Sequence, residues 1–496
     1  MIDRPPGFST TGTVAALVLT VFVSTGAARS DRSASAPSAL PERVDQFTDE
    51  WMRSNGIPGL ALAITRGTDI VHLAGYGDAG DGRPVTPDTQ FMVASLSKSM
   101  TALAVLQLEE TGLVDLDTPV QTYIADFAPA DSRAADITVR MLLNQTSGLA
   151  DSGFPEMVLP QPRTIADRSA SLRDARLVDE PGSSFHYFNP NYGVLAHLVE
   201  VVSGEPFEDY LGRTIFEPLQ MAHTASVVTS SAANSVAPDL ARGHILVFGV
   251  PVARPELDGY LGGSGGVIST ARDMANWLIV QSTGGRFQGH SVLSEHGVEL
   301  MQSPPPDIET SYAMGWEVPS GSQILRHTGI LSTFYAEQAL LPSEDVGIVF
   351  MANAYNGLVD FEGLMEGLAA LVRGESDPGI GFGARRIGIT VAIIAVLVAG
   401  VGTWRLLRVR AWADRRRGHL LRVSVGIVGP LILPALVLMT PNLVARSADR
   451  VYGWKVLILA IPGLMGTLIL AGVMGAALAF SRLMWIARLS RAKEES

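Results

Sequence analysis

Residues 91–101 read Phe-Met-Val-Ala-Ser-Leu-Ser-Lys-Ser-Met-Thr, with the tetrad Ser95-Leu96-Ser97-Lys98 at their centre. The segment 101–110 that follows is apolar on nearly every side of a helix, which predicts a buried helix ended by Gly112. Residues three apart lie on one face of a helix. We therefore expect Ser95 and Lys98 to be neighbours, with Ser95 in the first turn, where free backbone N–H groups point outward.

This spacing suits covalent catalysis. A serine hydroxyl is a weak nucleophile unless a nearby base takes its proton. A lysine amine can be that base when burial lowers its pKa towards neutrality, whereas an arginine cannot. A bare S-x-x-K pattern recurs by chance, so it is weak alone. However, residues 1–384 contain twenty arginines and a single lysine, Lys98. The other two lysines of the chain, Lys455 and Lys493, lie in the tail. The rarity of lysine in this part of the chain favours a catalytic role for Lys98.

Charge and composition exclude several classes of function. Residues 385–496 carry sixteen Lys/Arg against four Asp/Glu, a balance of +12, so the rest carries −12 − 12 = −24. An acidic body on a basic, apolar tail argues against nucleic-acid binding. The absence of cysteine excludes disulfides and a cysteine nucleophile. The nine histidines are scattered with no H-E-x-x-H pair, so a metalloenzyme has little support. The mechanism predicted from the residues below implies no metal and no organic cofactor.

The beginning of the chain is typical of an exported protein. An apolar run at 13–23 precedes small residues, so 1–28 is interpreted as a signal peptide or an uncleaved N-terminal anchor. Residues 29–44 are rich in Ser, Ala and Pro and are interpreted as a linker. The main domain is expected at 45–374, followed by a second linker at 375–386.

The end of the chain predicts a membrane anchor. Three stretches within 387–480 are long and apolar enough to cross a bilayer, namely Ile387–Trp404, Val423–Val444 and Val456–Phe480. Seven arginines separate the first two stretches, and basic residues also follow the third. The positive-inside rule then places that loop and the tail 481–496 in the cytoplasm and the main domain outside. The centres of the stretches hold no charged residue, which favours anchoring over transport.

The main domain is expected to have an α/β (α+β) fold, an antiparallel sheet flanked by helices. Strand patterns occur early, at 59–64 and 70–75, and again late as a predicted meander, at 313–318, 323–327, 334–340 and 346–351. Helices are expected at about 41–55 and at 358–373. The intervening segment 114–240 has mostly helical periodicity and predicts an inserted helical subdomain. One sheet would thus be built from both ends of the domain.

Four motifs occur in a fixed order: Ser95–Lys98, Ile137–Leu149, Tyr187–Asn189 and His327–Gly329. Over roughly residues 45–372 the chain resembles the serine hydrolases of the class C β-lactamase-related family, which includes β-lactamases, D-Ala-D-Ala carboxypeptidases, D-aminopeptidases and esterases. The resemblance implies a β-lactamase/transpeptidase-like fold.

The resemblance also implies a role for each catalytic residue. Ser95 corresponds to the nucleophile and Lys98 to its partner base. Tyr187 corresponds to the family's catalytic tyrosine, whose pKa should fall near a cationic lysine, so that the phenolate becomes a feasible proton acceptor. Asn189 would hydrogen-bond Lys98 and the substrate amide.

The family's third motif corresponds to His327-Thr328-Gly329, on a strand that lines the cleft. Gly329 would let the substrate approach the backbone closely. The backbone amides of Ser95 and Ile330 would form the oxyanion hole. β-Lactamases of the family usually carry lysine at the position of His327. A histidine is only partly charged near neutral pH and holds a carboxylate less well, so efficient penicillin hydrolysis is not expected.

A rival nucleophile is Ser264, because Gly262-Gly263-Ser264-Gly265-Gly266 matches G-x-S-x-G. That motif needs an apolar strand directly before it, and residues 255–260 are not such a strand. A glycine-rich loop is the better interpretation, with Thr270-Ala271-Arg272-Asp273 capping the next helix.

The sequence therefore predicts a membrane-anchored, extracytoplasmic serine hydrolase that works through a Ser95 acyl-enzyme. Its partners would be the lipid bilayer and a small-molecule or peptide substrate, for example one derived from the cell wall. Peptidase or amidase action and esterase action remain alternatives, with β-lactamase activity third. A non-hydrolytic receptor or sensor of β-lactam-like or cell-wall ligands, acylated once, also stays open.

Overall fold

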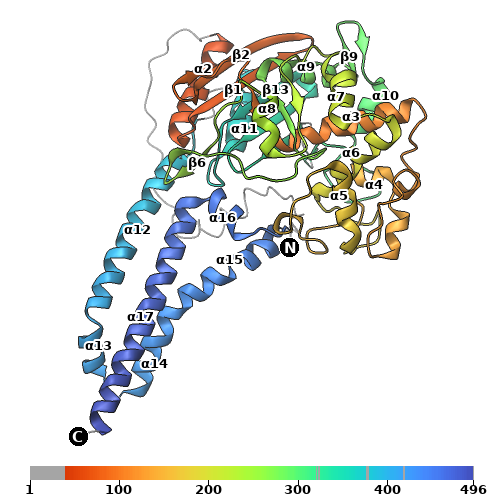
Figure 1. The fold of residues 1–496 in the computed structure, drawn as a ribbon. Helices are drawn as coiled ribbons and strands as arrows, with labels where there is room; N and C mark the ends of the chain where they lie inside the picture. The colour runs from red at the N-terminus through yellow and green to blue at the C-terminus, as the bar shows by residue number, and fades with distance from the viewer. Residues whose placement is uncertain are drawn as a thin grey trace.

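The computed structural model describes residues 39–494, apart from 320, 322–323, 376–378, 417–418 and 449. The segment interpreted as a signal peptide or anchor, 1–28, lies outside the described residues, as does most of the linker 29–44. The described part consists of a mixed α/β body from which long helices project to one side (Figure 1).

A six-stranded antiparallel sheet forms the centre of the body, in the order β11-β12-β13-β1-β2-β3. The strands are β1 (Gly59–Arg66), β2 (Asp69–Gly80), β3 (Arg83–Pro84), β11 (Leu325–Ile330), β12 (Tyr335–Leu341) and β13 (Val346–Ala352). The late strands form the predicted meander, and β13 pairs with β1. The prediction that one sheet is built from both ends of the domain is confirmed.

Helices cover both faces of this sheet. Along β1, Leu60, Leu62 and Ile64 pack with α2 (Leu40–Asn55) and α11 (Phe361–Val372) on one face. The alternate residues Ala61 and Ala63 belong to the core on the other face, which includes α9 (Ala271–Ser282). Successive strand residues point to opposite faces, so large side chains fill one layer and small ones admit a helix on the other.

A mostly helical part lies beside the sheet (Figure 1). It contains α4 (Val139–Leu143), α5 (Ile165–Ser171), α6 (Asn189–Ser203) and α7 (Phe207–Leu211). Between it and the sheet runs α3 (Ser97–Glu110), whose residues 97–106 are all buried. The helix predicted after the tetrad is therefore central to the body.

The remaining elements are short. They are β4 (Phe91–Met92), β5 (Ala225–Ser226), β6 (His244–Val247), β7 (Val250–Ala253), β8 (Val267–Ser269), β9 (Arg286–Phe287), β10 (His290–Ser291), β14 (Ala354–Tyr355), α8 (Ala233–Val236) and α10 (Glu295–Gln302). The strand expected at 313–318 is wrong. Gly315 there has φ +83°, and a Cβ on it would lie 2.5 Å from the backbone nitrogen of Ser99, so this segment is a tight turn against α3.

Three helices near the end of the chain are long and apolar enough to cross a membrane, at Ala384–Leu407, Leu420–Ser447 and Pro462–Arg491. The first is α12 (Ala384–Leu407). The second consists of α14 (Leu420–Val428) and α15 (Ile432–Ala448), joined by a 3₁₀ turn at Gly429–Leu431. α12 packs beside α17 (Pro462–Glu494), whereas α15 leans away towards the helical part of the body (Figure 1).

The third span begins later than the predicted Val456–Phe480. Residues Trp454–Ala460 form a separate short helix, α16, and α17 starts at Pro462. Proline lacks a backbone N–H and suits the first position of a helix, so it separates the two elements. The arginine-rich α13 (Val409–Arg416) and the C-terminus lie at the end of the spans farthest from the body (Figure 1).

The spans pack closely against the body at the turn of the β6–β7 hairpin. A Cβ on Gly388 of α12 would lie 2.3 Å from the carbonyl carbon of Phe248 in that turn. A Cβ on Gly463 of α17 would lie 2.8 Å from the Phe248 ring. The Asn55 side chain at the end of α2 also accepts a hydrogen bond from the backbone N–H of Ala384, at 2.9 Å. The first span is thereby joined directly to the body.

Gly388→Leu should break this contact. The new side chain has no space beside the backbone of Phe248, so we expect the unfolding free energy of the full chain in mild detergent to fall by about 1–3 kcal/mol. Gly400→Leu on the same helix is the matched control, because nothing lies within 4 Å of a Cβ there. Equal stability of the two variants in thermal melts would contradict this packing.

Candidate active site

Ser95 lies in a 3₁₀ turn, Ala94–Leu96, immediately before α3. The prediction put Ser95 in the first turn of the α-helix, but regular helix begins at Ser97. Ala94 has φ +50°, a left-handed conformation that is uncommon for alanine. The Ser97 hydroxyl bridges this turn, since it donates to Ala94 O at 2.6 Å and accepts from Val267 N at 3.0 Å. The nucleophile candidate is thus held in a strained turn beside β8.

The Lys98 amine is fully buried and lies against Ser95. Its Nζ donates to three oxygens: Ser95 Oγ at 3.0 Å, Asn189 Oδ1 at 3.0 Å and the carbonyl of Ser264 at 2.8 Å. Burial holds the Lys98 pKa well below its usual value, and the nearby Arg450 guanidinium lowers it further, while Glu156 opposes. In its neutral form the amine keeps two N–H groups, for Asn189 Oδ1 and the Ser264 carbonyl, and its lone pair faces the Ser95 hydroxyl and can accept the serine proton.

Tyr187 lies on the other side of the same amine. Lys98 Nζ is 4.9 Å from the centroid of the Tyr187 ring, and the phenol is hydrogen-bonded with Ser95. Burial nevertheless raises the pKa of the Tyr187 phenol, although the Ser95 hydrogen bond partly offsets this. The predicted fall of this pKa is therefore wrong, because removal of the phenol from water outweighs the nearby positive charge. Tyr187 is a neutral phenol at physiological pH.

Asn189 is the first residue of α6 and connects Lys98 to a buried carboxylate. Its Oδ1 accepts from Lys98, as expected, and its Nδ2 donates to Glu156 Oε1 at 2.9 Å. Glu156 is 5% exposed and also lies 3.8 Å from Arg168. The orientation of the Asn189 amide is set by Glu156.

The loop 144–149 supports the strand-like segment that carries Tyr187. Gln145 Oε1 accepts from Phe188 N at 3.2 Å and from Asn191 Nδ2 at 2.7 Å, and its backbone carbonyl accepts from His186 N. These hydrogen bonds between distant segments hold residues 186–191 against the loop. This motif therefore positions the tyrosine rather than contacting Ser95.

His327 lies on β11, buried among aromatic rings. Its Nδ1 bonds with the Thr328 carbonyl at 2.8 Å, and its ring centroid is 6.2 Å from that of Tyr187. Burial and the charge of Lys98 lower the pKa of His327 to about 3, so the ring is neutral at physiological pH. The prediction treated it as partly charged. It therefore offers no cation for a substrate carboxylate.

Gly329 allows a close contact within the body, while the expected approach of a substrate to its backbone stays a prediction. A Cβ there would lie 2.1 Å from the carbonyl oxygen of Val93, so glycine allows β11 to pack on the Ser95 turn. The next residue, Ile330, is 37% exposed and lines the pocket that Ser95 also lines. The two backbone amides proposed for the oxyanion hole thus belong to residues on one pocket.

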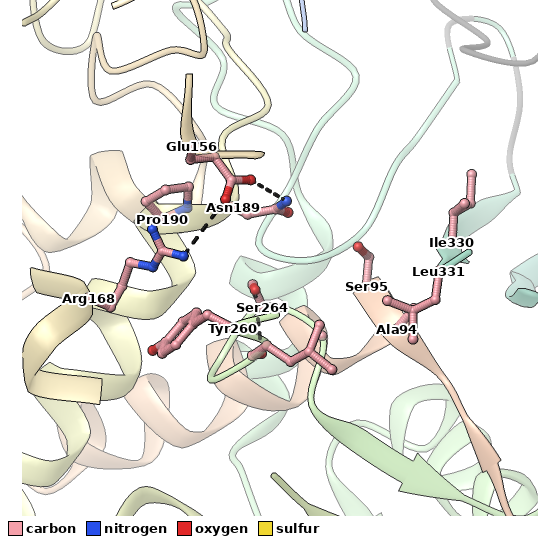
Figure 2. Close-up of a pocket in the computed structure, with 12 residues that line it drawn as sticks. Ala94, Ser95, Glu156, Arg168, Asn189, Pro190, Tyr260, Ser264, Ile330 and Leu331 are labelled. Carbon is pink, nitrogen blue, oxygen red and sulfur yellow. Dashed lines mark hydrogen bonds and ion pairs between the residues drawn. The ribbon is translucent and has the colours of Figure 1, made fainter. Parts of the chain in front are cut away.

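Ser264 also lines this pocket, but in a loop before β8 and not on a strand-to-helix elbow. Its carbonyl accepts from Lys98, and its hydroxyl is 3.4 Å from Leu261 O. Thr270 caps α9 by accepting from Asp273 N, as predicted. Figure 2 shows Ser95 and Ser264 facing the pocket, with Glu156, Arg168 and Asn189 opposite.

The sequence analysis missed two residues of this site, Glu156 and Arg450. Glu156 begins a short 3₁₀ helix, Glu156–Val158, whose sequence has no recognisable pattern. Arg450 belongs to the connection between the second and third spans, and its basic side chain is an exception to the orientation that the positive-inside rule predicts. That exception was the available signal. Within the residues that the structure describes, no group of three His, Cys, Asp or Glu side chains could hold a metal ion.

This fold and the Ser95–Lys98 pair define a serine hydrolase of the β-lactamase and penicillin-binding type. The model of the Beta-lactamase family matches residues 44–371, and the chain belongs to that family. Protein flp of Staphylococcus aureus (strain N315) is 25% identical over 318 residues, which are 63% of this chain and 63% of that protein. Unguisins hydrolase ungD of Aspergillus violaceofuscus is 28% identical over 338 residues, 60% of this chain and 58% of that protein. The match thus spans less than two thirds of these relatives.

Solved structures share the fold. The octameric penicillin-binding protein homologue from Pyrococcus abyssi has a TM-score of 0.59 at 26% identity, covering 71% of this chain and 81% of that one. The β-lactamase/D-alanine carboxypeptidase from Pseudomonas syringae has a TM-score of 0.56 at 23% identity, covering 69% of this chain and 100% of that one. The prediction of this family and of its fold is confirmed.

The buried neutral His327 predicts a pH effect on stability. Its pKa is about 3 in the folded protein and about 6.5 when unfolded. The unfolded state therefore binds more protons between these values, and stability is lost as the pH falls below 6.5. From pH 7.5 to pH 5 this contributes a loss of about 2 kcal/mol, which His327→Gln should lack.

The measurement is denaturant unfolding of the full chain at both pH values. His296→Gln, which changes an exposed histidine of α10, should behave like the wild type. A loss in His327→Gln as large as in the wild type would contradict a neutral buried ring.

Proposed function

We propose that the protein hydrolyses an ester, peptide or amide through an acyl-enzyme on Ser95. The observation that carries this proposal is the position of Lys98: its buried amine, with a lowered pKa, lies 3.0 Å from the Ser95 hydroxyl. Enzymes activate a serine by placing such a base within hydrogen-bond reach.

In the first step, the Ser95 proton moves to Lys98 Nζ while Oγ forms a bond to the substrate carbonyl carbon. Negative charge then develops on the carbonyl oxygen, where the N–H groups of Ser95 and Ile330 would donate to it. The intermediate collapses with loss of the alcohol or amine, which takes up a proton. Water then attacks the acyl-enzyme carbonyl, its proton passes to the base, and Ser95 is released as the hydroxyl.

Tyr187 is proposed to carry the proton to the leaving group. Its hydrogen bond with Ser95 places the phenol beside the reacting oxygen, and its raised pKa keeps it protonated before reaction. A neutral phenol can donate to a departing oxygen or nitrogen and recover the proton from Lys98. An amide needs this donation most, because an amine leaves poorly as an anion.

Two features weigh against β-lactams as the main substrate. The pKa of His327 leaves the third motif without the cation that would hold a β-lactam carboxylate. The pocket contains Arg168, but its guanidinium is 3% exposed and lies beside Glu156. Amides, simple esters and D-peptides that carry no carboxylate beside the scissile bond are the better candidates.

The catalytic body is proposed to face the outside of the cell. The arginine-rich helix α13 (Val409–Arg416) and the C-terminal part of α17 lie together at the end of the spans farthest from the body (Figure 1). The positive-inside rule assigns that end to the cytoplasm. Arg385 and Arg386, at the opposite end of the first span, are outnumbered.

The nucleophile can be tested by intact mass after reaction of the full chain with a serine-reactive phosphonate. We expect one adduct on the wild type and on Ser264→Ala, and none on Ser95→Ala. Lys98→Arg should slow labelling by about 10²–10⁴-fold, because general-base assistance is lost. Equal labelling of Ser95→Ala and wild type would instead implicate another serine.

Turnover distinguishes an enzyme from a receptor that is acylated once. The wild type is expected to release nitrophenol from nitrophenyl esters, or amine from D-amino-acid amides, over many cycles, while Ser95→Ala releases none. A stable Ser95 adduct without turnover would favour the receptor.

A further inference from the structure

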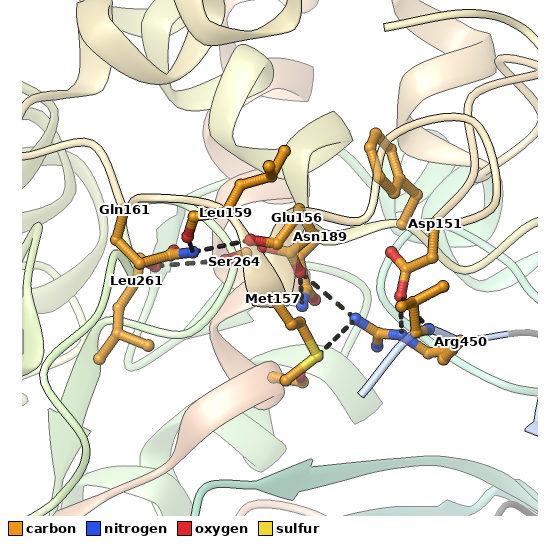
Figure 3. A network of polar contacts seen from close by, with 12 residues as sticks. Asp151, Glu156, Met157, Leu159, Gln161, Asn189, Leu261, Ser264 and Arg450 are labelled. Atoms are coloured by element: carbon orange, nitrogen blue, oxygen red, sulfur yellow. Dashed lines mark hydrogen bonds and ion pairs between the residues drawn. The ribbon is translucent and has the colours of Figure 1, made fainter. Parts of the chain in front are cut away.

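The connection between the second and third spans reaches the hydrolase site. The second span ends at Ser447, and Arg450 follows three residues later. Three residues of extended chain span at most about 11 Å, so Arg450 lies close to the end of the span. The Arg450 side chain is only 12% exposed and lies among residues of the body (Figure 3). The family match ends at residue 371, so this arginine is supplied by the C-terminal extension.

Arg450 docks on two buried carboxylates. Its Nε donates to Asp151 Oδ2 at 3.2 Å, and its Nη2 donates to Glu156 Oε1 at 3.3 Å. The backbone N–H of Val451 donates to the same Asp151 oxygen at 3.1 Å. The Asp151 and Glu156 side chains are 0% and 6% exposed. Charge-assisted hydrogen bonds in such a buried setting fix both partners.

Without this loop, the cluster would lack one positive charge. Asp151 and Glu156 carry two negative charges, and in the described body Arg168, 3.8 Å from Glu156, is the cation paired with them. Lys98 is needed in its neutral form. A buried carboxylate that loses its partner is strongly unfavourable, so the body relies on Arg450 for balance.

The contact with Glu156 continues to the catalytic lysine. Glu156 Oε1 accepts from both Arg450 and Asn189, and Asn189 Oδ1 in turn accepts from Lys98. If the Glu156 side chain moved, Asn189 Nδ2 would lose its hydrogen-bond acceptor and the amide could rotate. Lys98 would then lose its hydrogen bond to Asn189 Oδ1. The Arg450 guanidinium also lies 5.4 Å from the centroid of the Tyr187 ring.

We propose that Arg450 is a positioning residue of the Ser95 site, which through Glu156 and Asn189 holds the Lys98 amine against the serine. The hydrolase is then complete only when the loop between the spans is docked on the body. This inference rests on the proposed function, because it assigns a role within that reaction. Arg450 acts through its neighbours and has no bond to Ser95 or Lys98.

The charge of Arg450 also supports the proposed role, because it favours the neutral form of the Lys98 amine. Burial is the main cause of the lowered Lys98 pKa, Arg450 is the second, and Glu156 opposes both. The other titratable groups that face Lys98 are neutral near pH 7: His327, whose pKa is about 3, and the phenols of Tyr187, Tyr192 and Tyr312, whose pKa values burial raises. Asp151 is held behind Arg450 and has a raised pKa. Loss of Arg450 should therefore raise the Lys98 pKa.

The first test measures the rate of phosphonate labelling of Ser95 in the full chain across pH 6–10. We expect Arg450→Gln to label about 10- to 100-fold more slowly at neutral pH, with its rate profile moved to higher pH. Arg450→Lys keeps the charge but cannot bridge two carboxylates, so it should restore the pH profile more than the rate. Arg446→Gln, which changes an exposed arginine near the end of α15, should match the wild type.

The second test does not depend on activity. The chain has three lysines, so ε-carbon-labelled lysine gives three NMR signals in the detergent-solubilised protein, and Lys98→Arg assigns the one from Lys98. Its titration midpoint should move to higher pH in Arg450→Gln. Thermal melts of each variant show whether the fold is kept.

The outcomes separate this inference from the proposed function. An unlabelled wild type would refute the Ser95 nucleophile, while the Lys98 titration would still report on Arg450. If Arg450→Gln labels as fast as the wild type or faster, with an unchanged Lys98 midpoint, Arg450 is not a positioning residue. A faster rate would indicate that the loop obstructs the cleft.

Discussion

The burial of one amine, that of Lys98, is the constraint on which the rest of the site depends. A lysine inside a protein tends to lose its proton, and oxygen atoms of Ser95, Asn189 and the Ser264 carbonyl surround the Lys98 amine and hold it in place. Each acceptor comes from a different segment. The Ser95 turn, the start of α6 and the glycine-rich loop must therefore all be in place before the amine can act.

This requirement accounts for the close packing around the site. Gly329 lets β11 approach Val93, Gly315 turns against the start of α3, and Gln145 ties the Tyr187 segment to the loop before it. The same buried environment keeps His327 and Tyr187 uncharged. The C-terminal extension contributes Arg450 to the site. Its positive charge pairs with the carboxylates of Asp151 and Glu156, which lie next to Asn189.

Much of the fold was predictable because its signals are local. The Ser95–Lys98 spacing, the period-2 strands at both ends of the body and the three apolar stretches each depend on neighbouring residues. The prediction of a strand at 313–318 was wrong because Gly315 was not recognised as a turn residue with a left-handed backbone conformation. The third span began six residues later than expected because Pro462 starts a new helix after α16. The packing contact of Gly329 could not be predicted, since the Val93 carbonyl lies far away in sequence.

The sequence by itself determined the family, the contact between Ser95 and Lys98 and the presence of three apolar stretches, because spacing and hydropathy are read directly from the chain. Only the tertiary structure decided which groups meet at that pair. Burial, not the nearby lysine, sets the state of Tyr187, and Glu156 orients Asn189. Arg450 reaches the site from 294 residues beyond Glu156. Such contacts depend on how distant segments pack, and no local pattern in the sequence carries that information.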